Sequence, residues 1–180
     1  MVKRGINYKS KSQIEIPLVL NSYDEIFSGF DPRSYSQRAL SGDFIEECKK
    51  ASIEKEDKAE LKFFIPTSQR NPSHEREIKK RLKNHFHKHY HEQKHLLKKL
   101  NAQGIFWFLA GCFLTVLTAI LFENDNLSLA LRIVSNVAHP AGWFFLWEGL
   151  GKILLTSKEK NTDYLFYKKM SKSEISFVGY

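Results

Sequence analysis

Residues 104–122, GIFWFLAGCFLTVLTAILF, contain no charged side chain. A helix rises about 1.5 Å per residue, so a segment of this length spans the roughly 30 Å hydrocarbon core of a bilayer. A second apolar segment, residues 127–155, follows after the short polar stretch 123–126 and includes Arg132 and Pro140. The two segments together predict a transmembrane helical hairpin whose second helix is kinked at the proline.

Flanking charge predicts the orientation of this hairpin. Lys94, Lys98 and Lys99 precede the first apolar segment and Lys152 lies near the end of the second, whereas residues 123–126 contain no Lys or Arg. Loops rich in Lys and Arg stay on the cytoplasmic side, so we expect both termini to be cytoplasmic and residues 123–126 to face outward. The same four lysines are candidate contacts for anionic lipid head groups.

Alternating apolar residues predict strands near 13–20, 59–66 and 173–179. Pro17 cannot donate to a strand ladder, so the first strand is expected at a sheet edge. Because the third strand follows the hairpin, the C-terminal tail is expected to return to the cytoplasmic sheet. The predicted fold class is therefore an α+β membrane protein with a small sheet and a long juxtamembrane helix.

The expected organisation has six consecutive parts. They are a cytoplasmic α+β region (1–72), a basic juxtamembrane helix (73–103), the first transmembrane helix (104–122), an external loop (123–126), the second transmembrane helix (127–155) and the cytoplasmic tail (156–180).

The juxtamembrane helix is strongly basic on most of its surface. Residues 74–100 hold nine Lys or Arg and three acidic residues, a net charge of 9 − 3 = +6. One apolar stripe, led by Ile78, Leu82 and Phe86, is suited to packing on the sheet or on another copy of the chain. No nucleic-acid-binding motif accompanies the helix, which argues against nucleic acid and favours the anionic bilayer as its partner.

Small residues predict how the two membrane helices pack. Gly104 and Gly111 are seven residues apart in the first, and Gly142 and Gly149 are seven apart in the second, where Ala138 extends the stripe. In an antiparallel hairpin these positions fall at similar depths, so the helices are expected to approach closely there.

A polar face interrupts the second apolar segment. Arg132, Ser135, Asn136 and His139 follow a spacing of i, i+3, i+4 and i+7, which places them on one side of a helix. Polar residues at membrane depth mark function or a protein-facing surface. Two interpretations stay open: a structural or interfacial segment, and the lining of a pore or an oligomer seam.

The region between residues 21 and 52 is rich in aromatic and turn residues. It is either a packing unit of the cytoplasmic region or a docking surface for a protein partner. The candidate docking residues are Tyr23, Phe27, Phe30, Asp31 and Arg33.

Catalytic and metal chemistry have little support in the sequence. His87, His91 and His95 repeat one turn apart, a spacing that can supply metal ligands, but a single helix offers them a ridge and no enclosing pocket. No phosphate-binding loop, nucleophile elbow or HExxH motif is present. We therefore expect no enzyme activity, no cofactor and no metal site. The two cysteines, Cys48 and Cys112, fit a reducing compartment.

The whole chain resembles a group of uncharacterised bacterial two-span membrane proteins of unknown function. The resemblance rests on NSYDEIFS (21–28), FDPR (30–33), RALS (38–41) and WEGL (147–150). It implies an inner-membrane location and no particular activity.

The sequence thus predicts a membrane-anchored cytoplasmic interaction module that acts as an adaptor or subunit of a larger assembly. The alternative is a small oligomeric pore or transport subunit lined by the polar face of the second membrane helix. A protein partner or self-association is expected in either case.

Overall fold

The computed structural model describes residues 14–52, 59–122 and 128–180. Its Cα trace divides into two compact units. Unit 1 comprises Met1–Lys88 and Phe166–Tyr180, and unit 2 comprises His89–Leu165.

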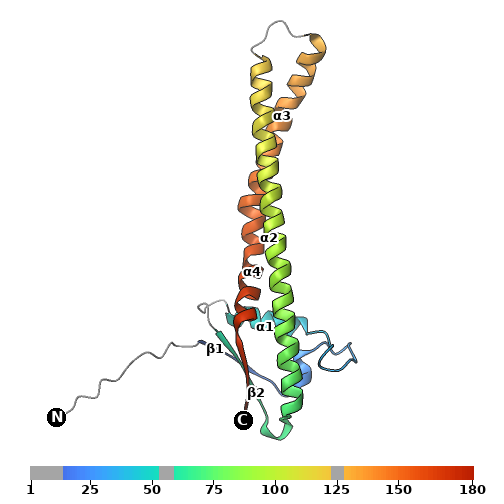
Figure 1. Cartoon of the computed structure of the whole chain (residues 1–180), viewed down its shortest axis with the longest axis vertical. Helices are drawn as coiled ribbons and strands as arrows, with labels where there is room; N and C mark the ends of the chain where they lie inside the picture. The colour runs from blue at the N-terminus through green and yellow to red at the C-terminus, as the bar shows by residue number, and fades with distance from the viewer. Residues whose placement is uncertain (1–13, 53–58, 123–127) are drawn as a thin grey trace, which may run out of the picture. The chain divides into compact units, whose positions relative to one another are not determined.

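Unit 1 is built on a three-stranded parallel sheet of order β1-β2-β3. The strands are Ile14–Val19, Ala59–Ile65 and Glu174–Gly179, which confirms the three predicted strands within two residues (Figure 1). β1 is an edge strand, as Pro17 requires. Parallel neighbours need a crossover connection, and between β2 and β3 that connection contains the whole of unit 2.

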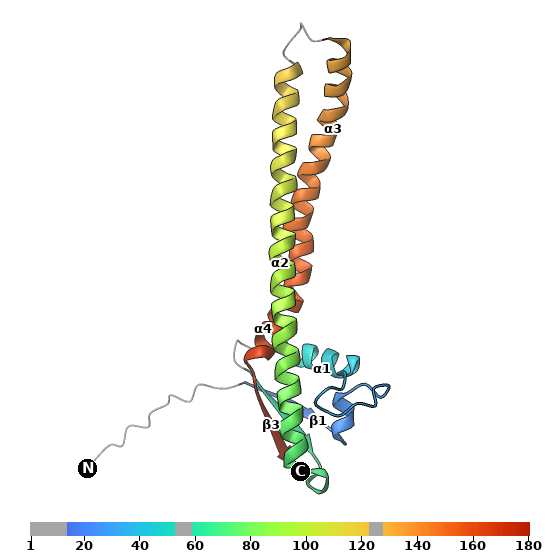
Figure 2. The same cartoon turned by 45° about the vertical axis from the view of Figure 1, so that its right-hand side comes forward.

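One face of the sheet carries the hydrophobic core of unit 1. The first crossover contains a short 3-10 helix, η1 (Tyr23–Ile26), and α1 (Gly42–Ser52). The second begins with the 3-10 helix η2 (Thr67–Gln69) and the start of α2 (Pro72–Phe122), and it closes with the end of α4 (Ser157–Lys172). These helices form the second layer (Figures 1 and 2). The buried core comprises Ile16, Leu61, Phe63, Ile65, Ile175 and Phe177 from the strands, Leu20, Tyr23, Ile26, Phe27, Phe44 and Cys48 from the first crossover, and Ile78, Leu82, Phe86, Phe166 and Met170 from α2 and α4.

The start of α2 shows why the helix forms where it does. Asn71 caps it, because its Oδ1 accepts the backbone N–H groups of Ser73 at 2.9 Å and His74 at 3.4 Å. Pro72 occupies the first helical position, where its missing N–H has no intrahelical partner to lose. No proline follows within the helix, so α2 continues without interruption to Phe122.

Unit 2 consists of the remainder of α2, then α3 (Leu129–Gly151), a π-helical turn η3 (Lys152–Thr156) and the start of α4. α3 runs antiparallel beside α2 and diverges from it toward its own N-terminus (Figures 1 and 2). Helical structure continues past residue 155, because η3 joins α3 directly to α4. The predicted external loop at 123–126 lies outside the described residues.

Within the described part of the chain, one helix, Pro72–Leu121, is long and apolar enough to cross a membrane by length and composition. Only 17% of its most apolar window is buried. α3, the second predicted span, does not meet the same test, because Arg132, Asn136 and His139 lower its mean hydropathy. The structure is thus an α+β fold with a small sheet and one long apolar helix that could span a membrane.

Candidate functional site

The contact between α2 and α3 is made through glycine backbones. A Cβ atom placed on Gly149 would lie 2.5 Å from the backbone N of Phe108 and 2.7 Å from the carbonyl oxygen of Gly104. A Cβ atom on Gly111 would lie 2.8 Å from the carbonyl oxygen of Gly142. These distances are shorter than the roughly 3.5 Å that carbon atoms keep from non-bonded neighbours. All four glycines of the predicted stripes therefore lie where the two helices are closest.

Next to the glycines lies a group of polar side chains between α2 and α3, in which Thr118 is buried and Thr115 and His139 are half-buried. The Thr118 hydroxyl, 1% exposed, donates to the carbonyl of Thr115 at 3.0 Å and lies 3.1 Å from His139 Nδ1. A hydroxyl has one hydrogen, so with that hydrogen on Thr115 the Nδ1 of His139 is the donor. This hydrogen bond ties α3 to α2. Ala138, predicted as a packing position, is half-buried beside it.

The structure divides the predicted polar face of α3 into two parts. Ser135 is 3% exposed and its hydroxyl has no hydrogen-bond partner, while His139 contacts α2. Arg132 and Asn136 lie on the exposed side of α3. The four residues therefore do not line one common surface, because the exposed and buried sides of α3 separate them.

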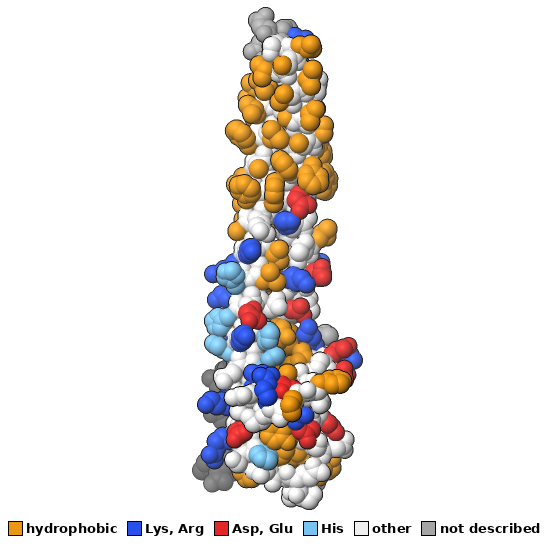
Figure 3. Space-filling model, turned by 90° about the vertical axis from the view of Figure 1, so that its right-hand side faces the viewer, with side chains coloured by type: hydrophobic (Ala, Val, Ile, Leu, Met, Phe, Trp, Pro, Cys, Tyr) orange, Lys and Arg blue, Asp and Glu red, His pale blue; other side chains and the backbone are white. Residues whose placement is uncertain are grey.

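Large apolar side chains dominate one end of the face shown in Figure 3, and many of the exposed ones belong to α2 and α3. Those more than half exposed include Ile105, Phe106, Leu109, Phe113, Val116, Ile120, Ile133, Val134, Val137, Trp143, Phe144 and Trp147. A soluble surface rarely carries a contiguous apolar area of this extent.

Toward the cytoplasmic ends predicted for the two membrane helices, the surface of unit 2 becomes basic. Lys94, Lys98 and Lys99 are exposed on α2, and the ammonium of Lys94 lies 5.8 Å from the centre of the Tyr90 ring. Lys152 instead forms an ion pair with Glu148, one turn earlier. Three of the four predicted head-group lysines thus lie on the exposed surface of α2, while the fourth is paired within the α3–η3 helix.

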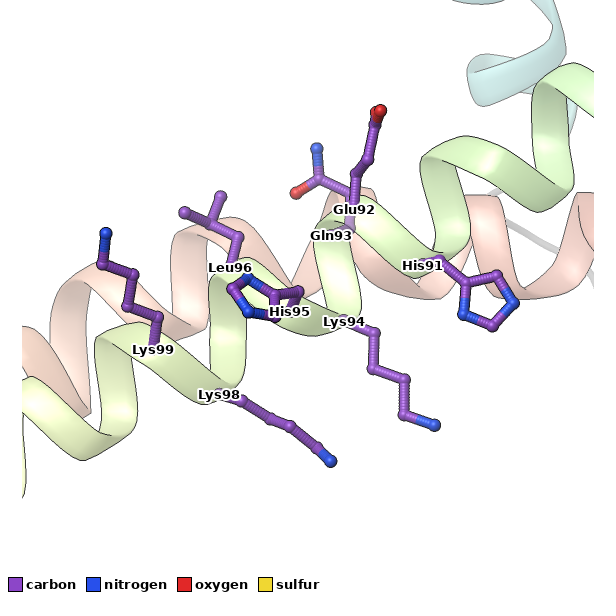
Figure 4. A pocket seen from close by; sticks show the side chains of 8 residues that line it. All are labelled: His91, Glu92, Gln93, Lys94, His95, Leu96, Lys98 and Lys99. Atoms are coloured by element: carbon purple, nitrogen blue, oxygen red, sulfur yellow. The ribbon is translucent and has the colours of Figure 1, made fainter.

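His91 and His95 lie at an open part of the α2 surface. A shallow hollow is lined by residues His91 to Leu96 with Lys98 and Lys99, all from one helix, and their side chains extend in several directions (Figure 4). His89 Nδ1 lies 2.8 Å from Glu92 Oε2. In the described ranges no group of three His, Cys, Asp or Glu residues could hold a metal ion.

In unit 1, the loop between η1 and α1 holds one aromatic side chain fully in solvent. Phe30 is 100% exposed. The next residue, Asp31, accepts the Arg33 Nε at 2.9 Å and the backbone N–H of Ala39 at 2.7 Å. These donors, with the Arg33 side chain first, hold the pKa of Asp31 well below its ordinary value. The loop therefore presents Phe30 from a hydrogen-bonded frame.

Two of the five predicted docking residues are not on the surface. Tyr23 and Phe27 are 6% and 3% exposed and belong to the core. They cannot contact a partner in the folded protein, so the predicted docking surface reduces to Phe30, Asp31 and Arg33. The sequence gave no clear sign that Tyr23 and Phe27 are buried, because the spacing of aromatic residues in and beside a short 3-10 helix does not distinguish inner from outer positions.

A buried hydrogen-bond network that sequence reasoning missed connects η1, η2 and α2. The Tyr23 hydroxyl donates to Glu75 at 3.1 Å and accepts the backbone N–H of Asn71 at 3.0 Å. Arg70 pairs with both oxygens of Glu75 at 2.9 and 3.1 Å. The Arg70 side chain lowers the pKa of Glu75, while burial raises the pKa of Tyr23. Every polar group named here has a partner, so the network reads as structural.

Cys48 is fully buried in the core of unit 1, and burial raises the pKa of its thiol to about 12. A thiol in that state is a poor nucleophile.

No family model, curated protein or solved structure matches the chain, so the resemblance to bacterial two-span proteins stays a prediction.

Proposed function

We propose that the chain is a non-enzymatic, membrane-anchored interaction module, an adaptor or subunit of a larger assembly at the bacterial inner membrane. Unit 2 would cross the bilayer twice, and unit 1 would carry the partner-binding surface in the cytoplasm.

The observation that carries this proposal is the pairing of β2 with β3. β2 precedes α2, β3 follows α4, and the two strands are hydrogen-bonded neighbours in one sheet. Strands of one sheet lie on one side of a membrane, so the connection between them crosses an even number of times. If α2 spans the bilayer, then α3 must return through it, despite its lower hydropathy.

The surface of unit 2 supports the crossing. A core helix of a soluble protein is mostly buried, whereas the apolar window of α2 is 17% buried. The contact with α3 leaves the larger apolar side chains outward, because it uses glycine and threonine positions. Helix contacts through small residues are typical of membrane proteins, where lipid solvates the larger side chains.

Phe30 supports the interaction role. Rigid aromatic side chains are frequent energetic centres of protein interfaces, and a frame that is ordered before binding reduces the entropy lost on association. Asp31 supplies that frame through Arg33 and Ala39.

Affinity purification in mild detergent with Phe30→Ser tests the interaction role. Phe30 contributes no core contact, so the variant is expected to fold normally, insert in the membrane and lose the co-purifying partner. The matched control is Val19→Ser, which removes another exposed apolar side chain of unit 1. Retention of every partner by Phe30→Ser at wild-type yield would exclude this docking surface.

A specific observation favours the second candidate, an oligomeric pore or transport subunit. Asn136 is exposed on α3 between the apolar residues Val134 and Val137. An amide facing lipid is costly, so a neighbouring copy would satisfy it. This candidate predicts that cysteine placed at Asn136 crosslinks two copies in native membranes, whereas cysteine at Phe144 does not. A monomer in mild detergent without crosslinking or conductance would exclude it.

A further inference from the structure

We propose that the π turn η3 is a register element of unit 2. It lets α3 and α4 pack on α2 along one continuous seam, although the chain between them holds one residue more than the seam can accommodate in a regular α-helix. This inference goes beyond the proposed interaction role and does not depend on it. The protein is therefore expected to tolerate the removal of one residue at this turn, but not the addition of one.

The seam begins with two glycines of α3 that are seven residues apart. A Cβ atom on Gly142 would lie 3.1 Å from the backbone N of Thr115, and one on Gly149 would lie 2.5 Å from the backbone N of Phe108. Thr115 and Phe108 are also seven residues apart. Two antiparallel α-helices keep such a match, because both rise about 1.5 Å per residue and return to nearly the same face after seven residues.

Beyond Gly149 the match is offset by one residue. α3 and α4 follow one another along α2 (Figures 1 and 2), and the Ser157 hydroxyl lies 2.6 Å from Asn101 Oδ1. Phe108 and Asn101 are seven residues apart on α2, whereas Gly149 and Ser157 are eight apart on the facing segment. The facing segment therefore holds one residue more than the antiparallel match allows.

A second contact, farther along α4, shows the same surplus. Gly149 faces Gly104, whose carbonyl oxygen would lie 2.7 Å from a Cβ atom on Gly149. Tyr164 stacks on Tyr90 with ring centres 5.7 Å apart. Gly104 and Tyr90 are fourteen residues apart, whereas Gly149 and Tyr164 are fifteen apart. The surplus is still one residue at Tyr164, so it arises wholly between Gly149 and Ser157.

The π turn lies in that interval. η3 covers Lys152–Thr156, and the backbone N–H of Ser157 donates to the carbonyl of Lys152, five residues earlier. A single turn with this i→i+5 bond accommodates an additional residue inside a helix. In a regular α-helix the additional residue would rotate everything after it by about 100°, and Ser157 and Tyr164 would turn away from α2. The turn therefore keeps both contacts on the seam.

Packing and hydrogen bonds fix the two ends of the turn. At its start, Lys152 and Ile153 lie against Gly104, where a Cβ atom would come within 3.3 and 2.6 Å of their side chains. At its end, Ser157 is 9% exposed, and its hydroxyl lies 3.0 Å from the Lys152 carbonyl. The surplus is thus confined to the residues between these ends.

The residues between the two ends project outward. Leu154 and Leu155 are 60% and 73% exposed. Because the two neighbours are identical, removal of either gives the same sequence. One leucine can therefore be removed without deleting a side chain that the seam uses, and a regular α-helix can then connect Ile153 to Ser157.

The test changes the length of the turn by one residue in each direction. Removal of Leu154 changes KILLT to KILT, and insertion of a leucine after Leu155 gives KILLLT. Both changes are made in the full-length protein without native cysteines, with Asn101→Cys and Ser157→Cys added as a disulfide pair. The purified proteins are oxidised with copper phenanthroline in mild detergent, and mass spectrometry of maleimide-labelled thiols measures the crosslinked fraction.

We expect the Leu154 deletion to form the disulfide to the same extent as the protein of natural length, and the insertion variant to lose it. After the insertion, the π turn still absorbs one residue, and the other rotates α4 by about 100°. On a Cα radius of about 2.3 Å this moves residue 157 by roughly 3.5 Å and turns its side chain away. A disulfide needs Cβ atoms about 3.5–4.5 Å apart.

Deletion of Lys160 is the matched control, because it removes one residue from the regular helix α4. This variant should keep the disulfide between positions 101 and 157, but should unfold at a lower dodecyl sulfate concentration than wild type, since Tyr164 turns away from Tyr90. The Leu154 deletion should unfold at the wild-type concentration or above it.

Loss of the disulfide, or of folded protein, in the Leu154 deletion would overturn the proposal. An unchanged crosslinked fraction in the insertion variant would overturn it as well, because the segment would then adapt to any length. These outcomes concern packing within unit 2, so they are distinguishable from the loss of a partner in Phe30→Ser.

Discussion

Replacing Gly149 by alanine tests the close approach of α2 and α3. The new Cβ would lie 2.5 Å from Phe108 N, 2.7 Å from Gly104 O and 2.8 Å from Phe108 Cα. All three atoms belong to the backbone of α2, so no side chain can rotate away. Restoring a contact of about 3.5 Å requires the helices to separate locally by about 1 Å.

The matched control is Gly151→Ala, two residues later in the same helix, because its Cβ would meet no atom within 4 Å. Both substitutions gain helix propensity of about 1 kcal/mol, and the comparison cancels this gain. Overpacking a closely fitted contact costs about 1–3 kcal/mol. We therefore expect the free energy of unfolding of Gly149→Ala to be about 1–3 kcal/mol lower than that of Gly151→Ala.

The assay is unfolding of the purified protein in mixed micelles with increasing dodecyl sulfate, followed by the circular dichroism signal of the helices. Gly151→Ala should unfold at or slightly above the wild-type concentration of dodecyl sulfate, and Gly149→Ala clearly below it. If Gly149→Ala is as stable as Gly151→Ala, the two helices do not make the backbone contact described above.

Three further predictions concern buried polar groups and thiols. Glu75→Gln is expected to lower the stability of unit 1 by about 1–3 kcal/mol, because it weakens the pairing with the part-buried Arg70, while the exposed control Glu77→Gln changes it by less than about 0.5 kcal/mol. The pKa of Glu75 is lowered in the folded state, so its contribution to stability is complete above the unfolded-state pKa and is lost as pH falls through the folded-state pKa. Chemical denaturation between pH 7 and 3 should show this loss of stability for wild type but not for Glu75→Gln. Thr118→Val removes the hydrogen bond to His139 and should lower the free energy of unfolding by about 0.6 kcal/mol. Ser135→Ala should instead leave stability unchanged or raise it, because the Ser135 hydroxyl has no hydrogen-bond partner. Equal losses of stability for the two variants in dodecyl sulfate titration would contradict this difference. Cys48, with a pKa of about 12 and no exposed surface, should react with a water-soluble maleimide only after unfolding, as mass spectrometry of the labelled Cys112→Ala variant can check.

The regular elements were predictable because their patterns are local. Alternation around Ile16, Phe63 and Phe177 identified the three strands, since each buries one face on the helices. The start of α2 is local in the same way, since the capping chemistry of Asn71 and Pro72 acts within a single turn. Glycine spacing indicated the α2–α3 contact for a similar reason, because small residues one or two turns apart define a stripe on any helix.

Features that depend on tertiary contacts were not predictable. Nothing in the sequence distinguishes the buried Tyr23 from the exposed Phe30, because Tyr23 lies in a four-residue 3-10 helix and Phe30 in a loop, both too short to show a periodic pattern. The π-helical turn at Lys152–Thr156 was missed, since the sequence there favours helix of any register. Directly after the π turn, the Ser157 hydroxyl lies within hydrogen-bond distance of the carbonyl of Lys152 and of the Asn101 side chain. The latter contact exists only once the helices have packed.

The most direct test of the account is the number of membrane crossings between β2 and β3. In a variant without native cysteines, single cysteines are placed at Ser10, Asn124 and Ser171, and a membrane-impermeant maleimide is applied to intact cells and to inverted vesicles. We predict labelling of Asn124→Cys from outside only, and of Ser10→Cys and Ser171→Cys from the cytoplasmic side only. Labelling of Ser10→Cys and Ser171→Cys from opposite sides would contradict the shared sheet, and carbonate-extractable protein would contradict the membrane anchor itself.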